Sequence, residues 1–141
     1  MVDDLFNLKG RVSIELNGQI VQEIDNLVVT AGKVFVASRM KDATATAMSH
    51  MAVGTNTGSA AVGNTALGAE SARVALTSTT PSSATVVYVA TFPAGTGTAA
   101  LTEAGILNAS SSGTLLCRTV FTTINKGSAD AMTVSWTITV S

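Results

Sequence analysis

The stretch Met132-Thr-Val-Ser-Trp-Thr-Ile-Thr-Val-Ser141 decides the predicted fold. Apolar and hydroxyl side chains alternate along it, and a β-strand sends successive side chains to opposite faces of its sheet. Most of its residues are β-branched or aromatic, the types that suit a pleated, half-buried surface. The stretch therefore predicts a long inner strand, with one face in the core of a sandwich and a hydroxyl face on the other side.

Seven further segments resemble strands, because they are short runs of β-branched, aromatic and other apolar residues separated by turn residues. They are 11–16, 19–24, 50–54, 72–80, 85–92, 101–108 and 114–124. Their short connections favour antiparallel neighbours. We therefore predict an all-β fold, an antiparallel β-sandwich of about eight strands with a jelly-roll or related Greek key topology. An N-terminal arm over 1–10 should precede a single sandwich domain over 11–141.

A hairpin is predicted at Asn17-Gly18. This pair joins two extended runs, and it favours a tight turn because both turn residues need a positive φ. A two-residue loop would pair Leu16 with Gln19 and Ile14 with Val21.

One short helix is expected near 30–40. Thr30 is the candidate N-cap of a helix over 31–40, because a Thr hydroxyl can accept a hydrogen bond from an early backbone N–H. Apolar residues then recur at helical spacing. A strand over 33–37 is the competing interpretation, because that run is β-branched and aromatic.

The composition indicates a protein that works in contact with other subunits. The 141 residues are 46% hydrophobic but only 12% charged, about half the usual charged share, so neutral residues must build much of the surface. The net charge of −1, with scattered basic residues, does not favour nucleic-acid binding. No apolar run approaches the ~18–20 residues of a membrane span, and the acidic start is unlike a signal peptide.

No residue pattern points to catalysis, metal binding or a cofactor, so we expect no enzyme. His50 is the only histidine, and its neighbour Ser49 should point to the opposite face of a strand. One histidine and the single Cys117 cannot supply the three or four ligands of a zinc site, and a free thiol in an apolar run usually behaves as a buried hydrophobe. The glycine-rich runs 54–58 and 95–97 lack the ending of a phosphate loop and are predicted to be flexible inter-strand loops.

Glu103 is isolated in an uncharged stretch. It is the only Asp, Glu, Lys, Arg or His between Arg73 and Arg118. Because a partly buried carboxylate needs a partner, we expect it to pair with one of these arginines, and Glu103 with Arg118 is the candidate structural ion pair. Gly105 should mark a bulge or a close backbone approach.

Three stretches resemble small structural proteins of tailed bacteriophages. They are LVVTAGK (27–33) with ASRM (37–40), MAVGT (51–55) with TALGAE (65–70), and LTEAGILN (101–108) through LCRTVF (116–121) and Lys126 to WTITV (136–140). Together they cover most of the chain after residue 26. Chain size and pattern are similar to the jelly-roll cement (decoration) proteins of phage capsids, of the type found in a Bordetella podovirus.

The resemblance implies a virion protein on the outer surface of an icosahedral capsid, made in the bacterial cytoplasm. Its partner would be the major capsid protein, whose neighbouring subunits it would clamp. A homo-oligomer is expected, with a dimer favoured and a trimer possible. Similar segments in tail-fibre and baseplate-associated proteins make a tail-fibre or tail-attachment module the first alternative. A carbohydrate-binding β-sandwich is the second.

Four residues are candidate subunit contacts. Leu5, Phe6 and Leu8 are the apolar residues of the arm, for which a disordered tail is the competing interpretation. Thr137 lies on the hydroxyl face of the terminal strand, which could face water, a second strand layer or another subunit. The resemblance supplies no catalytic residues.

Overall fold

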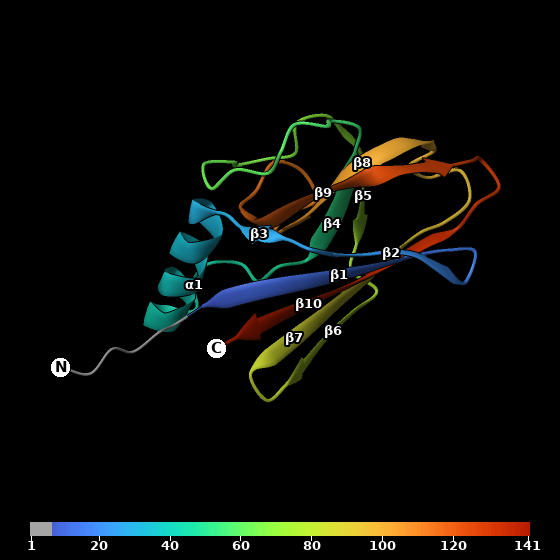
Figure 1. The fold of residues 1–141 in the computed structure, drawn as a ribbon. Helices are drawn as coiled ribbons and strands as arrows, with labels where there is room; N and C mark the ends of the chain where they lie inside the picture. Colours follow the sequence, from blue (N-terminus) through green and yellow to red (C-terminus); the bar gives the residue numbers. More distant parts are fainter. Residues whose placement is uncertain (1–6) are drawn as a thin grey trace.

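The computed structural model describes residues 7–141 as two five-stranded antiparallel sheets packed face to face, with one helix at one end (Figure 1). The first sheet, in the order β2-β1-β10-β7-β6, contains β1 (Leu8–Leu16), β2 (Gln19–Asp25), β6 (Ser78–Ser82), β7 (Thr85–Phe92) and β10 (Met132–Val140). The second, in the order β3-β9-β8-β4-β5, contains β3 (Leu27–Val28), β4 (His50–Gly54), β5 (Glu70–Ala75), β8 (Ala99–Leu107) and β9 (Leu115–Lys126). The predicted all-β sandwich is confirmed, with ten strands in place of about eight.

The terminal strand β10 is the central strand of its sheet. It pairs with β1 on one side and β7 on the other. Its apolar residues Met132, Val134, Trp136 and Ile138 are buried between the sheets, while its hydroxyl residues are half-buried on the opposite face. The prediction of an inner strand with one face in the core and a hydroxyl face on the other side is therefore confirmed for β10.

The segment 72–80 is two strands, because the chain crosses from one sheet to the other within it. Leu76 donates its backbone N–H to Ser49 beside β4, whereas Thr77 donates to Val89 in β7. β5 therefore belongs to the second sheet and β6 to the first. The strand pattern continues through the crossing, so a single strand was the wrong prediction.

The predicted hairpin forms with a shifted register. Asn17 and Gly18 have φ of 51° and 82°, as the two-residue turn requires. Leu16 faces Gln19 as predicted, but a bulge after Ile14 places that residue opposite Gln22 instead of Val21.

The helix α1 (Thr30–Asp42) replaces the competing strand. Thr30 is its first residue and not its N-cap; Val29 takes the cap position without a side-chain hydrogen bond. Thr30 instead donates its backbone N–H to the carbonyl of Val62, so a loop satisfies the helix start. Gly32 lies directly on β9, where a Cβ would overlap the carbonyl of Leu116.

The predicted arm is shorter than 1–10, because β1 begins at Leu8. Asn7 exchanges backbone hydrogen bonds of 2.7 and 2.9 Å with Ser141, and Leu8 pairs with Val140 and packs partly buried against the core. Leu8 is therefore a strand residue of the sandwich. Leu5 and Phe6 lie outside the described residues.

Candidate functional site

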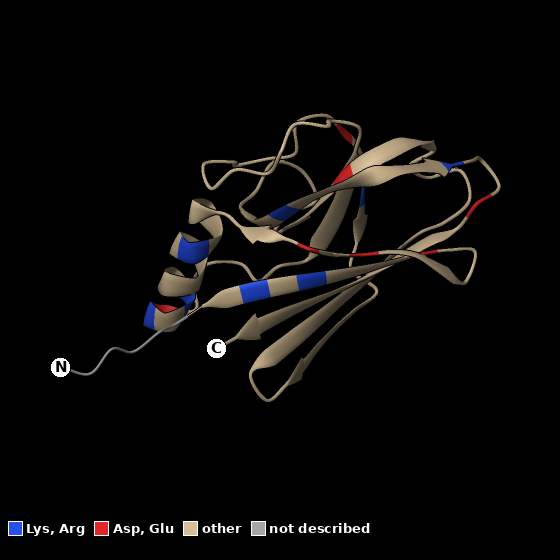
Figure 2. Ribbon diagram, viewed as in Figure 1, with Lys and Arg blue, Asp and Glu red and all other residues tan. Residues whose placement is uncertain are grey.

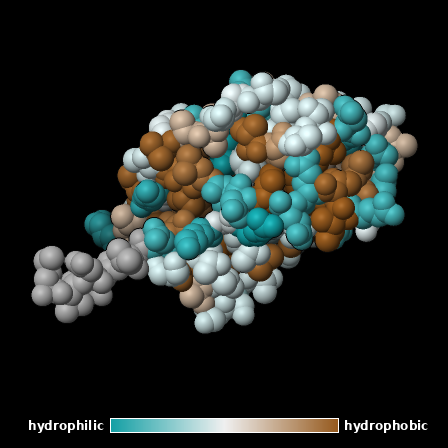
Figure 3. Space-filling model, in the orientation of Figure 1, coloured by the Kyte–Doolittle hydropathy of each residue, from teal (hydrophilic) through white to brown (hydrophobic). Residues whose placement is uncertain are grey.

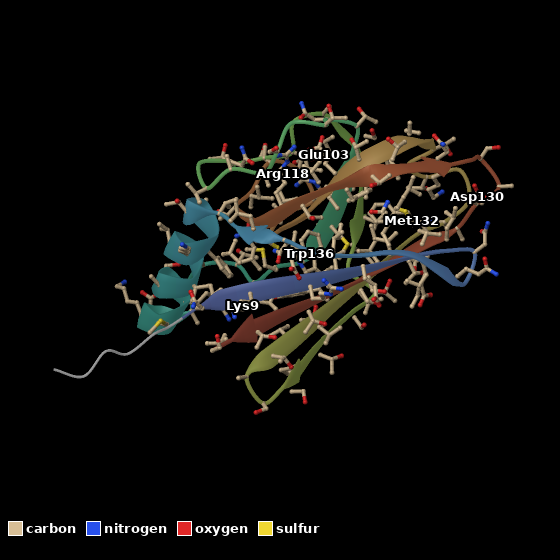
Figure 4. All side chains as sticks on the ribbon, in the orientation of Figure 1. Lys9, Glu103, Arg118, Asp130, Met132 and Trp136 are labelled. Atoms are coloured by element: carbon tan, nitrogen blue, oxygen red, sulfur yellow. The ribbon has the colours of Figure 1, made fainter. Side chains whose placement is uncertain are left out.

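Glu103 and Arg118 form an ion pair inside the second sheet (Figure 4). Glu103 lies on β8 and Arg118 on the neighbouring β9, and the guanidinium Nε lies 3.0 Å from Oε1. The Glu103 side chain is fully buried, and 4% of the Arg118 side chain is exposed. Arg73, the other expected partner, binds Glu70 through two nitrogens instead. The ion pair of Glu103 with Arg118, predicted from the isolation of Glu103 in the sequence, is therefore confirmed.

The Glu103 carboxylate also accepts three backbone hydrogen bonds from the loop between β4 and β5. The N–H groups of Asn56, Gly68 and Ala69 donate to it over 2.9, 2.8 and 2.7 Å. Burial acts to raise the pKa of Glu103, but these backbone donors and Arg118 outweigh it and hold the pKa below its ordinary value. The carboxylate is therefore charged and fully engaged, which suits a structural role and leaves no oxygen for a substrate.

Arg118 binds the same loop from its other side. Its guanidinium donates to the carbonyls of Gly58 and Ser59 over 3.0 and 3.3 Å, and to the side-chain oxygen of Asn64 over 3.1 Å. The glycine-rich run 54–58 is thus held to the sheet by an ion pair, which corrects the prediction of a flexible loop.

Lys126 and Ser49 have surroundings that the sequence did not predict. Lys126 is buried, and its ammonium donates to the carbonyls of Pro93 and Asp130 over 3.0 and 2.6 Å. Ser49 lies before β4, so strand alternation does not apply to it, and its hydroxyl lies 2.8 Å from Nδ1 of His50. That pair lacks a hydrogen-bonded acid among residues 7–141, so the geometry of a catalytic triad is not assembled in this range.

Cys117 is buried, as expected of a thiol in an apolar run. Burial raises the pKa of the thiol far above its usual range, although contacts with the Asn26 side chain and the Ile106 backbone act in the opposite direction. Within the described range, no three His, Cys, Asp or Glu residues lie close enough to hold a metal ion. The same range contains no helix with the length and apolar character to cross a membrane.

On the outer side of the first sheet, β10 and β7 form a surface of neutral residues, bordered on the β1 side by Lys9, Arg11 and Glu15. We define the hydroxyl face as Thr133, Ser135, Thr137 and Thr139 of β10 with Val87 and Val89 of β7. Thr137 lies between Arg11 of β1 and Val87, and Ser135 lies beside Val89. β10, β7 and β6 contain no charged residue, and Figure 2 shows this part of the sheet without Lys, Arg, Asp or Glu.

A second surface feature is a groove between α1 and the start of β1, which we call the α1 groove. It has a volume of about 750 Å³. Its walls are residues of three segments: Asn7, Leu8, Lys9 and Gly10; Asp25, Asn26, Leu27 and Val28; and Lys33, Val36, Ala37 and Met40. Figure 3 shows hydrophobic residues gathered over the end of the molecule where α1 lies. Met40 is 79% exposed although it is apolar.

No protein-family model, curated protein or solved structure matches the chain.

Proposed function

We propose that this chain is a structural virion protein that binds the outer surface of an icosahedral phage head and clamps neighbouring major capsid subunits. The uncharged hydroxyl face carries the proposal. Its side chains are half-buried and neutral, so covering them with another protein removes no ionic group from water. The resemblance of three sequence stretches to phage cement proteins supports the same assignment.

The rigidity of the sandwich suits a clamp. The ion pair of Glu103 and Arg118 fixes a long loop, and β10 is held by strands on both sides. A rigid module loses little conformational freedom when it binds, so more of its interface energy remains to hold two subunits together.

The clamp would act by differential binding. A protein that contacts two subunits only in the expanded shell stabilises that shell by its binding free energy and leaves the unexpanded shell unaffected. Many symmetric copies repeat the effect at every joint, so a weak individual contact is sufficient.

Cryo-electron microscopy of virions from the phage that encodes the chain tests the location. We expect density of this sandwich outside the head, at joints between major capsid subunits. Density in the tail would support the tail-attachment alternative instead, and virions that lack the chain altogether would reject both assignments.

The clamp itself is tested by heating expanded heads with and without added protein. Added protein should raise the temperature at which expanded heads release their DNA and should leave unexpanded heads unchanged. An equal effect on both shells would contradict differential binding.

A further inference from the structure

Two turns contact each other at the end of the sandwich away from α1 (Figure 1). The turn between β1 and β2 contributes Asn17, and the turn between β9 and β10 contributes Asp130 and Ala131. Nδ2 of Asn17 donates to the Asp130 carboxylate over 2.9 Å, and Oδ1 of Asn17 accepts the backbone N–H of Ala131 over 3.0 Å. The backbone N–H of Asn17 also donates to the Ala131 carbonyl over 2.9 Å. We call these three hydrogen bonds the turn clasp.

Asp130 also holds its own turn together. Its second carboxylate oxygen accepts the backbone N–H of Gly127 over 2.7 Å, and its carbonyl accepts a hydrogen bond from the buried ammonium of Lys126 over 2.6 Å. The hydrogen bond from Asn17 is the largest of the effects that hold the pKa of Asp130 below its ordinary value. Each carboxylate oxygen therefore has one donor, and Asn17 supplies the donor that comes from outside the turn.

Asn17 precedes Gly18, and the two form the only Asn-Gly pair in the chain. An asparagine in this position can react with its own backbone, because glycine has no Cβ to shield its nitrogen. The Gly18 nitrogen forms a bond to Cγ of Asn17, and the carboxamide nitrogen leaves as ammonia together with the proton of the attacking nitrogen. Water then opens the cyclic succinimide and leaves aspartate or isoaspartate at position 17. Overall the chain takes up water and releases ammonia, and nothing is oxidised or reduced.

The turn clasp opposes this reaction in the folded protein. Both polar atoms of the Asn17 carboxamide are hydrogen-bonded to the turn between β9 and β10. To bring Cγ onto the Gly18 nitrogen, the carboxamide must rotate and break both bonds. Asn17 and Gly18 are exposed, so water is available for the second step. The rate should therefore follow the opening of the clasp.

Either product removes the clasp. An aspartate at position 17 has no Nδ2 donor, and its carboxylate would lie beside the Asp130 carboxylate, where like charges repel each other. An isoaspartate adds a methylene group to the backbone and so changes the length of the two-residue turn. Asp130 would lose its donor from the β1–β2 turn in both cases.

We propose that Asn17 is a site of spontaneous deamidation, which the turn clasp delays in the folded protein and which releases the turn between β9 and β10 once it has occurred. The original amide is not regenerated, so the modified fraction rises with the age of the protein. The inference goes beyond the proposed function and is independent of it, because it concerns only chemistry within one chain.

Peptide mass spectrometry of the full chain, incubated in mildly alkaline buffer, measures the rate at Asn17. The folded wild type should deamidate at least about a hundredfold more slowly than the chain in denaturant, because two hydrogen bonds must break first. Asp130→Ala should raise the folded-state rate at least about tenfold, because the bond to the charged partner is lost.

Glu23→Ala is the matched control. It removes another exposed carboxylate from the same hairpin, but Glu23 lies opposite Ser13 and away from the turn, so the rate should not change. In denaturant all three chains should react equally fast. Circular dichroism would confirm that both variants are folded in buffer.

Hydrogen–deuterium exchange tests the release of the turn. Asn17→Asp, which has the composition of the product, should speed exchange in residues 127–131 at least about tenfold. Adding Asp130→Asn should slow it again, because the new amide can donate to the new carboxylate with the two roles exchanged. Exchange in α1, at the other end of the sandwich, should be the same in all chains.

The proposal is overturned if the folded wild type deamidates as fast as the chain in denaturant, or if Asp130→Ala reacts no faster than Glu23→Ala. Unchanged exchange in residues 127–131 of Asn17→Asp would equally overturn it, because the modification would then release nothing.

Discussion

At the residue scale, Glu103 is a carboxylate without water contact that accepts hydrogen bonds from one guanidinium and three backbone amides. Glu103→Gln should lower the free energy of unfolding by about 3–5 kcal/mol, because Arg118 would remain buried without its counter-charge. Urea denaturation at pH 7 measures the loss. Glu23→Gln, which makes the same change at an exposed carboxylate of β2, should cost much less; similar losses in both variants would contradict a special role for the buried pair.

The same residue makes stability depend on pH. The pKa of Glu103 is lower in the folded protein than its ordinary value of 4.5. Its contribution is therefore fully present above about pH 4.5 and is lost as the pH falls through the folded-state pKa, because the unfolded chain then binds the proton more readily. Between pH 4.5 and 2, unfolding free energy should fall more steeply for the wild type than for Glu103→Gln. Parallel curves would exclude Glu103 as a source of acid sensitivity.

Cys117 should be chemically inert in the folded protein. Its thiol is buried and its pKa is raised, and alkylation or disulfide exchange requires an exposed thiolate. At pH 8, a thiol-specific reagent should therefore react with the folded protein only as fast as the sandwich opens. In denaturant the same reaction should be fast. Rapid stoichiometric reaction of the native protein would show that the thiol is accessible.

The sequence could predict the ion pair but not its surroundings. Glu103 stood out because no other charge lies near it in the chain, and burial of a lone carboxylate demands a partner. Three of its other partners are backbone N–H groups, which every residue except proline carries, so no sequence pattern marks Asn56, Gly68 or Ala69. Lys126 was missed for the same reason, because its acceptors are two backbone carbonyls.

At the element scale, α1 depends on the absence of a side chain at Gly32. In an ordinary exposed helix, glycine to alanine stabilises by roughly 0.5–1 kcal/mol. In this helix we expect Gly32→Ala to destabilise the protein, because the new Cβ would overlap the Leu116 carbonyl of β9. Thermal unfolding measures the sign. Ala37→Gly, at an exposed helix position, is the control for propensity alone and should also destabilise; a higher melting temperature for Gly32→Ala would contradict the close contact.

Alternation along the chain predicts elements whose two faces have different surroundings. β10 and β1 each have one buried face, and their patterns were read correctly from Val12 and Ile14 and from Met132 to Val140. The crossing at Leu76–Thr77 was not visible, because the chain remains extended while its hydrogen-bond partners change from one sheet to the other. The start of α1 was misplaced by one residue because a backbone carbonyl of a distant loop, at Val62, takes the place of a side-chain cap.

At the scale of the whole molecule, the charged residues and the neutral surface are separated. Within residues 7–141, charged residues lie on β1, β2, α1, β5, β8 and β9 and at Asp130, whereas β10, β7 and β6 carry none (Figure 2). Three neighbouring strands of one sheet are therefore free of charged residues. The face of Thr137 was open to three interpretations from the sequence, and the sheet order leaves it on the outer side of the first sheet, away from the second.

Thr137→Lys tests that surface. The residue is half-buried beside Arg11 and Val87, so a lysine can extend its stem over the sheet and keep its ammonium in water, and the fold should lose at most about 1 kcal/mol. If the hydroxyl face contacts the capsid, binding must bury the new ammonium, and the number of copies per expanded head should fall at least about tenfold.

The control is Thr123→Lys, which adds the same charge at an exposed threonine of β9 in the other sheet. Copies per head, counted by quantitative gel analysis of purified particles, should match the wild type for this variant. Equal occupancy for the two variants, with both chains folded, would place the capsid contact elsewhere and remove the hydroxyl face from the account of the clamp.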